Sequence, residues 1–321
     1  MSALLRRAGP ALGLLAAWLL FAALAGGDFV SVANQRLMLL QTAVVGTAAV
    51  GATLIIISGG IDLSVGSTIA LGTMSAAIAL RAGHSPGVAA LAGIGTGVLV
   101  GAVIGVMVIG KIPLARWRAR LPLSPFIVTL GMWGAVRGLA KGLGDNQPVY
   151  PKSTGWLADL MLPTGGLLPA GVWILLAVAV SFAALLRYTR LGRHALAVGS
   201  NAETARLCGV DVEKTKLLVY VLGVGCAGIA SVLQLSYLSI GDPTTAQGAE
   251  LKVIAAAVIG GASLSGGEGS ILGTILGALL MTVVDNGCTK IGLDNWVQEC
   301  VTGAIIVAAV AIDRLRHRSS D

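Results

Sequence analysis

The sequence is poor in the residues that make a water-soluble surface. Only 12% of its 321 residues are charged, against roughly 25% in an ordinary soluble domain. Aromatic residues make up 4% of the chain. A soluble globule of this size would need far more polar surface than these residues supply. The composition therefore excludes a soluble globular domain, and it equally excludes a disordered chain, a collagen and a disulfide-based scaffold.

Signatures of catalysis and of metal or nucleotide binding are also missing. The three histidines, His84, His194 and His317, lie in expected loops or in the tail, apart from any plausible nucleophile or metal partner. No GxSxG or GxxxxGK[ST] pattern occurs, so neither a nucleophile elbow nor a phosphate-binding loop is predicted. We therefore expect no catalytic residue, no metal site, no cofactor bound by this chain and no nucleic-acid partner.

Cysteines are few, and their spacing carries no redox or metal signal. Cys208, Cys226, Cys288 and Cys300 include no CxxC pair. We interpret them as small packing residues. A pairing of Cys288 with Cys300 near the outer face is the alternative.

Long apolar runs are what the chain does contain. Hydrophobic residues make up 55% of it and the mean hydropathy is +0.87. At roughly 20 apolar residues per bilayer crossing, this predicts an all-α polytopic transmembrane bundle of about ten spans with interrupted half-helices, forming a single domain over 1–321. The expected segments are 9–27, 37–58, 65–82, 87–109, 126–142, 169–186, 217–239, 251–263, 271–288 and 296–313. The eighth is too short to cross and is expected to be a half-helix.

The first of these segments has two interpretations. Arg6 and Arg7 precede an apolar run, 11–25, that ends in Ala-Leu-Ala and resembles a cleavable signal peptide. Because many further spans follow, we expect an uncleaved first helix.

The positive charges indicate the orientation. The net charge is +7, and 15 of the 22 lysines and arginines fall in four segments, 6–7, 111–120, 187–216 and 314–318. Ten crossings put these four segments on one face. The positive-inside rule places that face, and with it both termini and the 187–216 loop, in the cytoplasm. The proline-containing segment 143–168 is then the largest outer loop.

Glycines recur at every fourth position in two of the expected helices. Such a stripe lets a neighbouring backbone approach closely. We expect tight packing within the chain, and a dimer face is the alternative. The glycines are Gly93, Gly97, Gly101 and Gly105 in one helix, and Gly269, Gly273 and Gly277 near another.

A weak internal repeat marks two candidate helix breaks. The segment 59–64, GGIDLS, is similar to 260–265, GGASLS, and each follows an isoleucine-containing run. Transporters are often built from two repeats with interrupted helices at corresponding places. The candidate pathway residues are Gly59, Gly60, Asp62, Ser64, Gly260, Gly261 and Ser265.

Asp62 is the foremost intramembrane polar residue, because a charge in lipid is costly and usually faces a cavity or a partner. Asp62 or Ser64 is expected to cap the next helix by accepting its free backbone N–H bonds. Contact with a transport pathway is the alternative. Weaker candidates near the outer ends, which solvation at the rim explains equally well, are Gln234, Glu250, Asp285 and Asn286.

A short helix is predicted inside the 187–216 loop. Asn201 is a natural N-cap, Glu203 favours the first turn, Arg206 the last turn, and Gly209 a left-handed stop. Two turns are marginal alone, so we expect a partner to pack on this helix, with the small residues Ala202 and Ala205 allowing a close approach. A solvated linker is the alternative.

Several motifs, in the same order along nearly the whole chain, resemble the permease subunits of ribose-type ABC sugar importers. They are 59–67, 125–131, 191–210 and 254–269. The resemblance implies a bacterial inner-membrane permease dimer, a cytoplasmic ATP-binding subunit that uses ATP and Mg, and a periplasmic sugar-binding protein. It also implies that the loop at 192–212 couples to the ATPase. Two departures from the family pattern are Lys252, where an acidic residue is common, and Ser200, where a glycine is common.

The leading hypothesis is therefore a sugar importer permease that has no energy source of its own and works by alternating access. An ion-coupled secondary transporter or channel for a small polar solute is the alternative, and it predicts several buried acidic residues along a pathway. A structural membrane scaffold is a third possibility, which would not need a capped cytoplasmic helix. The sequence does not identify the sugar.

Overall fold

The computed structural model describes residues 3–110, 123–162 and 168–318. Within these residues the chain forms helices, turns and an isolated antiparallel bridge between Val149 and Gly241. The helices in chain order are α1 (Ala3–Ala25), α2 (Gly27–Val30), α3 (Val32–Ile57), α4 (Val65–Arg81), α5 (Pro86–Ile109), α6 (Pro125–Gly142), the 3-10 helix η1 (Gly155–Leu160), α7 (Ala170–Tyr188), α8 (Arg190–Ser200), α9 (Ala202–Leu207), α10 (Val212–Leu238), α11 (Ala249–Ile259), α12 (Ile271–Lys290) and α13 (Asn295–Arg318).

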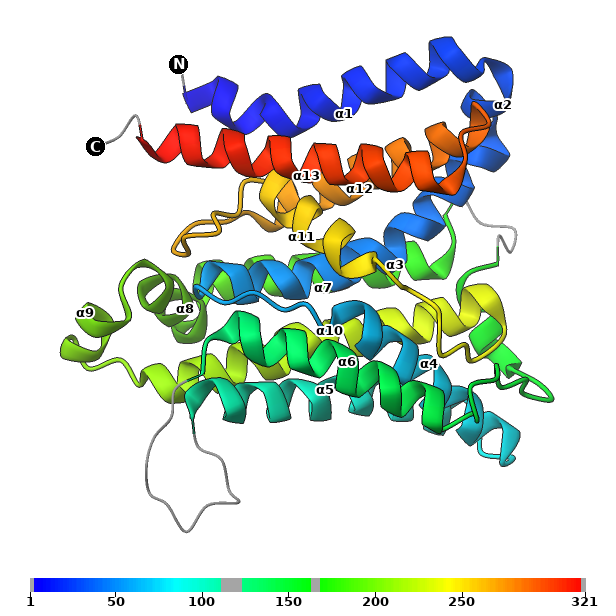
Figure 1. Ribbon diagram of the computed structural model, residues 1–321, viewed down its shortest axis with the longest axis horizontal. Coiled ribbons are helices and arrows are strands. Elements are labelled where there is room, and N and C mark those ends of the chain that lie inside the picture. Colours follow the sequence, from blue (N-terminus) through cyan, green and yellow to red (C-terminus); the bar gives the residue numbers. More distant parts are fainter. Residues whose placement is uncertain (1–2, 111–122, 163–167, 319–321) are drawn as a thin grey trace.

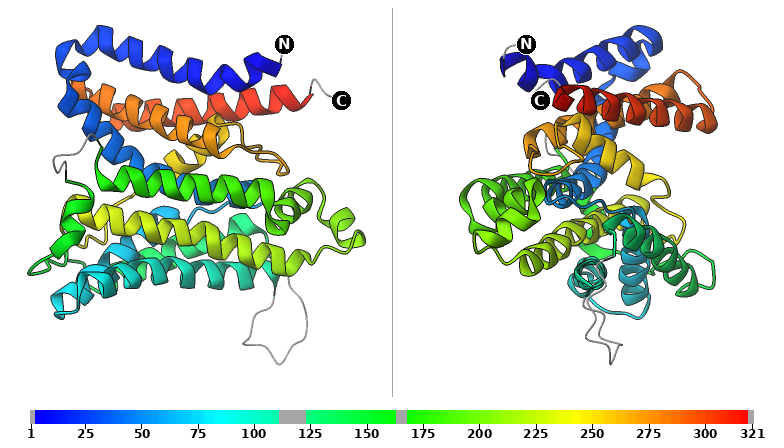
Figure 2. Two further views of the ribbon diagram at one scale, coloured as in Figure 1. Left: turned by 180° about the vertical axis from the view of Figure 1, so that it is seen from behind. Right: turned by 60° about the vertical axis from the view of Figure 1, so that its left-hand side comes forward.

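The long helices lie side by side in a bundle that is organised around α3 (Figure 1). This helix is buried along most of its length and packs against α7, α10, α11 and α12. Helices α1 and α13 are both at one edge, where α1 packs against α12, and α4 and α5 lie near the opposite edge (Figure 2). Both chain ends are at the end of the bundle that carries α8 and α9, whereas η1 is at the other end (Figures 1 and 2).

The helices coincide with the predicted apolar segments. Each of the ten segments falls on a helix, and five helices, α3, α5, α7, α10 and α12, are long and apolar enough to cross a bilayer. Helix α11 has 11 residues, about 17 Å at 1.5 Å per residue, which is roughly half of a hydrocarbon core. The eighth segment is thus a short helix, and its predicted last residues, 260–263, form a turn instead.

Two helices begin before the predicted apolar segments, at residues that cap their N-termini. Helix α3 starts at Val32, earlier than predicted, because the Ser31 hydroxyl accepts from the Asn34 N–H at 3.3 Å. Helix α10 starts at Val212 because Asp211 accepts from the Lys214 N–H at 3.0 Å. The predicted 187–216 loop is consequently mostly helical. Of the four basic segments, 111–120 lies outside the described residues.

The glycine stripe of α5 packs against α10 inside the same chain. A Cβ added at Gly97 would lie 2.6 Å from the Gly228 nitrogen, and one at Gly101 would lie 2.5 Å from the Tyr220 carbonyl oxygen. The second stripe has the same role, because a Cβ at Gly277 would overlap the backbone of α11. The predicted intramolecular packing is confirmed for both stripes.

We predict that Gly97→Val destabilises the bundle, because the added side chain must push α5 away from α10. Overpacking of this kind costs about 1–3 kcal/mol. The measurement is the melting temperature of the purified protein in lipid nanodiscs. Gly95→Val is the matched control, because a Cβ at Gly95 has no atom within 4 Å, and equal melting temperatures for the two variants would contradict the packing.

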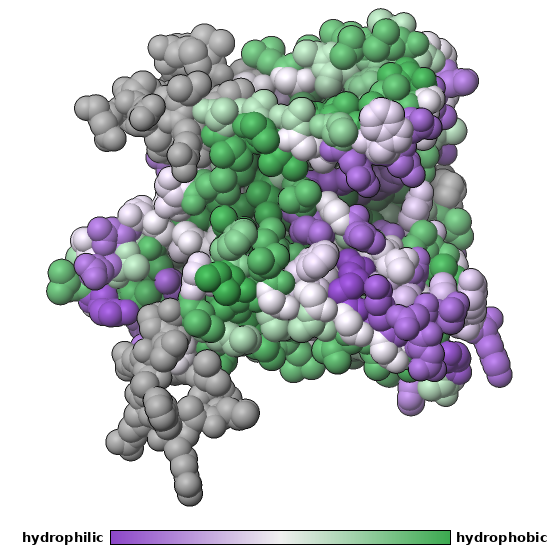
Figure 3. Space-filling view, in the orientation of Figure 1, coloured by the Kyte–Doolittle hydropathy of each residue, from purple (hydrophilic) through white to green (hydrophobic). Residues whose placement is uncertain are grey.

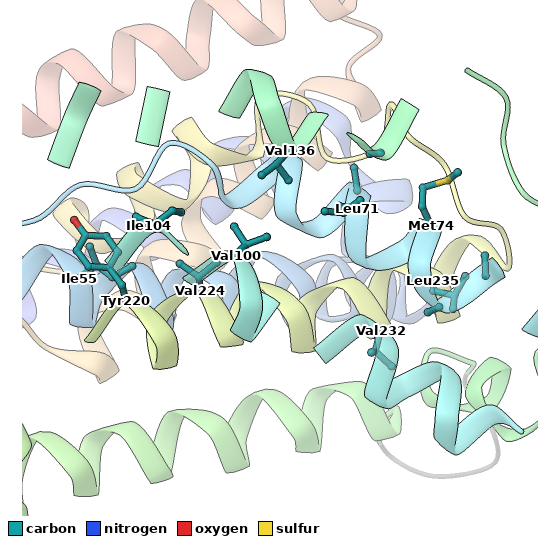
Figure 4. Close-up of a cluster of buried hydrophobic side chains, with 14 of the residues drawn as sticks. Ile55, Leu71, Met74, Val100, Ile104, Val136, Tyr220, Val224, Val232 and Leu235 are labelled. Carbon is teal, nitrogen blue, oxygen red and sulfur yellow. The ribbon is translucent and has the colours of Figure 1, made fainter. Parts of the chain in front are cut away.

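The main apolar core fills the space between α3, α4, α5 and α10. Figure 4 shows Leu71 and Met74 from α4, Val100 and Ile104 from α5, and Val224 from α10 among its members. These five side chains are at most 8% exposed. Tyr220 of α10 reaches the unwound segment that joins α3 to α4, because a Cβ added at Gly60 would lie 2.5 Å from its hydroxyl oxygen.

Two buried asparagines pair across helices α3 and α12. Asn34 and Asn286 exchange two amide hydrogen bonds of 2.8 and 3.0 Å, so Asn286 is a core residue of α12 and is not at a solvated rim. The four cysteines are all free. Cys288 is buried and Cys300 is exposed, so the alternative pairing is not formed.

Candidate functional site

The first helix break lies between α3 and α4. Gly59 has φ = +80°, and the Gly60 N–H donates to the Ile55 carbonyl oxygen at 3.0 Å, which is the glycine-based helix stop that the left-handed conformation permits. The chain then runs unwound to Ser64. Since Gly60, Asp62 and Ser64 are all buried, this unwound backbone lies in the protein interior.

Asp62 organises this unwound segment. Its Oδ1 accepts from the Ser64 N–H at 2.8 Å and from the Ser64 hydroxyl at 2.7 Å. The side chain is 2% exposed, yet its Oδ2 has no hydrogen-bond partner. A buried carboxylate oxygen without a partner is costly. Asp62 therefore carries an unused acceptor inside the bundle.

The capping role predicted for these two residues is only partly correct. Asp62 binds the N–H of Ser64, which is the N-cap residue of α4, and does not bind an N–H within the first helical turn. The Ser64 side chain makes no capping bond, because its hydroxyl donates to Asp62. The carboxylate thus holds the entry to α4 and leaves the helix N-terminus free of a side-chain cap.

The second break, between α11 and α12, repeats the helix stop. Gly261 has φ = +95°, and the Ala262 N–H donates to the Ala257 carbonyl oxygen at 2.9 Å. Gly261 therefore corresponds in conformation to Gly59, although the alignment of the two sequence segments pairs Gly59 with Gly260. Gly260 is the C-cap of α11, and both glycines line a cavity of about 850 Å³.

The two breaks also share a turn, and its residues are those that the alignment of the two sequence segments pairs, Asp62 with Ser263 and Ser64 with Ser265. The Ser265 N–H donates to the Ser263 hydroxyl at 3.3 Å, as the Ser64 N–H does to Asp62. In the first break Asp62 comes three residues after the helix stop at Gly59, whereas in the second break Ser263 comes two residues after the helix stop at Gly261. The two breaks are thus similar in local structure, although the acceptor of this turn is a carboxylate in the first break and a hydroxyl in the second.

The two breaks meet beside the C-terminal end of α8. The Gly267 N–H donates to the Ile57 carbonyl oxygen at 2.8 Å, joining the second break to the last residue of α3. Gly199 lies against this bond, because a Cβ there would overlap the Ile57 carbonyl and the Gly267 nitrogen. The sequence analysis missed Gly199, since nothing in the local sequence indicates a tertiary contact of this kind. Helix α8 is therefore in direct contact with both breaks.

A buried acidic residue also faces the first turn of α4. Glu250 is 8% exposed, and its Oε1 accepts from the Trp133 indole N–H at 3.1 Å. Its Oε2 has no partner and lies where a Cβ of Gly66 would be. Arg137, one turn after Trp133, donates to the Thr245 carbonyl oxygen at 2.8 Å and so holds the chain before α11. Solvation at the rim is therefore the wrong interpretation of Glu250.

Helix α9 has the local structure predicted for it. The Asn201 side chain accepts from the Thr204 N–H at 2.9 Å, Glu203 lies in the first turn, and Arg206 lies in the last. Gly209 follows with φ = +84°. The N-cap, the charge placement and the glycine stop are confirmed.

The support for α9 comes from its own chain. Ala205 is 5% exposed and packs with Val198 of α8 and Val212 of α10, and half-buried Ala202 joins this cluster. The expectation that Ala205 receives a partner is therefore wrong, because its own chain covers it, whereas contact of a partner with the rest of α9 stays a prediction. What α9 presents to the outside is Leu207, 88% exposed, beside the exposed Glu203 and Arg206. Leu207 is a candidate contact residue that the sequence analysis missed.

Comparison with known proteins identifies the class of chain. A family described as the permease component of branched-chain amino acid transport systems matches residues 36–310. The chain belongs to this family of transport-system permeases. The permease is a multi-pass protein of the inner membrane, because it belongs to this family and has helices that are able to cross a bilayer.

Several curated permeases are similar to this one over most of their length. The ribose import permease protein of Escherichia coli (strain K12) is 36% identical over 296 residues, which are 90% of this chain and 88% of the relative. The L-arabinose ABC transporter permease protein of Azospirillum brasilense is 34% identical over 294 residues, 90% and 82% of the two chains. The D-allose transport system permease protein of Escherichia coli (strain K12) is 34% identical over 296 residues, 92% and 88% of the two. No solved structure matches the permease.

Proposed function

We propose that the permease is the membrane subunit through which an ATP-driven ABC importer moves a monosaccharide or related polyol into the cytoplasm. The observation that carries this proposal is the similarity, over about nine tenths of the chain, to permeases of ribose, L-arabinose and D-allose systems. The permease itself is a transport subunit and not an enzyme. ATP and Mg are used by a separate ATP-binding subunit, and this chain binds no cofactor.

The proposed topology has about ten crossing or half-crossing helices with both termini in the cytoplasm. Two features support it: both chain ends share an end of the bundle with α8 and α9 (Figure 1), and the lysines and arginines cluster in the corresponding sequence segments. The outer loop 143–168, which contains η1, then faces the periplasm and the sugar-binding protein. The segment 187–216 is the cytoplasmic coupling region of a single domain, 1–321.

In this arrangement α9 is the contact for the ATP-binding subunit. An exposed leucine flanked by two charges suits a partner surface, because apolar contacts supply affinity and charges supply register. Gly199 links the same region to both helix breaks, so a displacement of α8 is transmitted to Asp62 and its neighbours. The residues of the two helix breaks then border the pathway, which a second permease subunit completes. These residues are Gly59, Gly60, Asp62, Ser64, Gly260, Gly261 and Ser265.

An ion-coupled secondary transporter is the second candidate, and one observation favours it. Asp62 and Glu250 are both buried, and each has an oxygen without a partner, which is the pattern expected where an ion or proton binds. The absence of ATP dependence in the transport reaction would support this candidate over the first.

The test is uptake by proteoliposomes that contain the permease, its ATP-binding subunit and its sugar-binding protein. We expect accumulation of at least one of D-ribose, L-arabinose and D-allose, only with ATP and Mg on the ATPase side. L-Leucine serves as the comparison solute, because the family description names branched-chain amino acids. Uptake of leucine alone, or uptake driven by an ion gradient without ATP, would overturn the proposal.

A further inference from the structure

A cavity of about 430 Å³ lies between α3, α10, α11 and α12, apart from the two helix breaks. Its walls include the last residues of α12 and the chain just before α11, so it opens toward the end of the bundle opposite α8 and α9. Figure 3 shows hydrophilic residues beside a hollow toward this end of the molecule, next to a surface of apolar residues. A polar cavity within a membrane bundle is costly unless something polar occupies it.

The polar groups of this cavity come from all four helices. Gln41 of α3, Gln234 of α10, Lys252 of α11 and Asp285 of α12 line it, and Gln247 lies at the entrance to α11. Among the described residues, no side-chain hydrogen bond involves the amide of Gln41 or of Gln247. The Gln234 amide donates to the Thr245 hydroxyl at 2.9 Å, which leaves its carbonyl oxygen directed to other donors. A side-chain amide offers donors and an acceptor together, as hydroxyl groups require.

The charges in the wall favour a neutral solute. Lys252 and Asp285 form an ion pair that joins α11 to α12, with each side chain partly exposed, at 34% and 25%. Because the two charges are opposite and adjacent, the pair presents no net charge to a molecule in the cavity. The ammonium and the carboxylate can still make further hydrogen bonds. Lys290, at the exposed end of α12, is the remaining charged residue in the lining. Fixed charge therefore does not select an anion at the centre of the cavity.

We propose that this cavity is a transient binding site for a neutral, polyhydroxylated small molecule of monosaccharide size on its way through the permease. The proposal rests on the function proposed above and names the side chains that would receive the sugar after its release at the outer face. The volume lies within the range of about 300–1,000 Å³ that is typical of small-molecule sites. Half-exposed amides in an open cavity give weak binding, which a transport step needs because the solute must leave again.

The test is protection of a cysteine in the wall, measured on the permease alone in lipid nanodiscs. Ala249→Cys, in a variant in which the four native cysteines are replaced, puts a thiol on the lining. Ser153→Cys, exposed in the 143–168 segment at the same end of the bundle, is the control. At about 0.1 M solute and a Kd of about 10 mM, occupancy slows modification of the lining cysteine roughly tenfold. Val45→Cys, on the α3 wall, is the second position if Ala249→Cys does not insert.

The solutes are D-ribose, L-arabinose and D-allose, with L-proline as the osmotic control. We expect protection by a sugar that the wild-type complex transports, at the lining positions only, and loss of protection when Gln41→Leu and Gln234→Leu are added. In the complete importer the same two substitutions should lower the maximal uptake rate while the half-saturating sugar concentration, set by the binding protein, stays unchanged.

Two results would overturn the proposal. One is equal modification of the lining cysteine with and without a sugar that the complex transports, and the other is equal slowing at Ser153→Cys. Uptake by the wild-type complex is measured separately. A failure of this site with intact sugar uptake is thereby distinguished from a failure of the proposed sugar transport itself.

Discussion

Replacing Leu207 by arginine is expected to lower sugar-stimulated ATP hydrolysis of the assembled importer by about tenfold or more, without loss of the inserted permease. Leu207 is 88% exposed, so the substitution has no packing within the chain to disturb. Burial of a leucine side chain against a partner contributes about 1.5–3 kcal/mol, and 1.4 kcal/mol already corresponds to a factor of ten. An arginine there would also have to bury an unpaired charge in the contact.

Glu203→Arg is the second variant for the same contact. It reverses a charge at the positive end of α9 and presents the wrong charge to the partner, so uncoupling is expected in the same direction. Leu207→Met is the matched control, because it keeps an apolar side chain of similar size. The assay compares ATPase rates with and without sugar-loaded binding protein in proteoliposomes. Unchanged stimulation and full retention of the ATP-binding subunit in both charged variants would show that α9 is only a linker.

The helices could be predicted from the sequence because apolar runs of this length have one stable form in a bilayer. The errors concentrate at helix ends, where polar, charged or glycine residues flank the apolar run. Helix α10 begins with Glu213, Lys214 and Lys216, which lower its hydropathy, although Asp211 caps it as the N-terminal rules predict. Helix α8 was missed for a related reason, since its alternation of small, basic and apolar residues has no long apolar run.

The site was predictable only where a residue contrasts with its immediate neighbours. Asp62 stands out because it is an acidic residue between two apolar runs, and Asn201 and Gly209 stand out because caps and stops have local rules. Gly199 and Leu207 have no local signal, since a close backbone approach and an exposed side chain are tertiary properties. Glu250 was discounted for the same reason: position near a helix end does not reveal burial.

Asp62→Ala is expected to lower both the stability of the permease and its uptake rate. The substitution removes the acceptor of two hydrogen bonds and leaves the Ser64 N–H and hydroxyl unpaired in the interior. An unsatisfied buried group costs about 1–3 kcal/mol. These bonds hold the unwound chain at the start of α4. Their loss should therefore disturb the proposed pathway as well as destabilise the fold, and we expect uptake to fall about tenfold or more.

Asp62→Asn separates the two contributions of the carboxylate. Its amide oxygen can replace Oδ1 as the acceptor for Ser64, whereas the other carboxylate oxygen, which has no partner in the described structure, becomes an NH₂ group. If the bonds to Ser64 are the main role, the asparagine variant keeps the melting temperature and most of the uptake that the alanine variant loses. A normal melting temperature with uptake as low as in Asp62→Ala would instead assign the role to the free oxygen, in contact with the solute or an ion. Wild-type uptake by both variants would remove Asp62 from the pathway, because neither the hold on Ser64 nor the buried charge would then matter to transport.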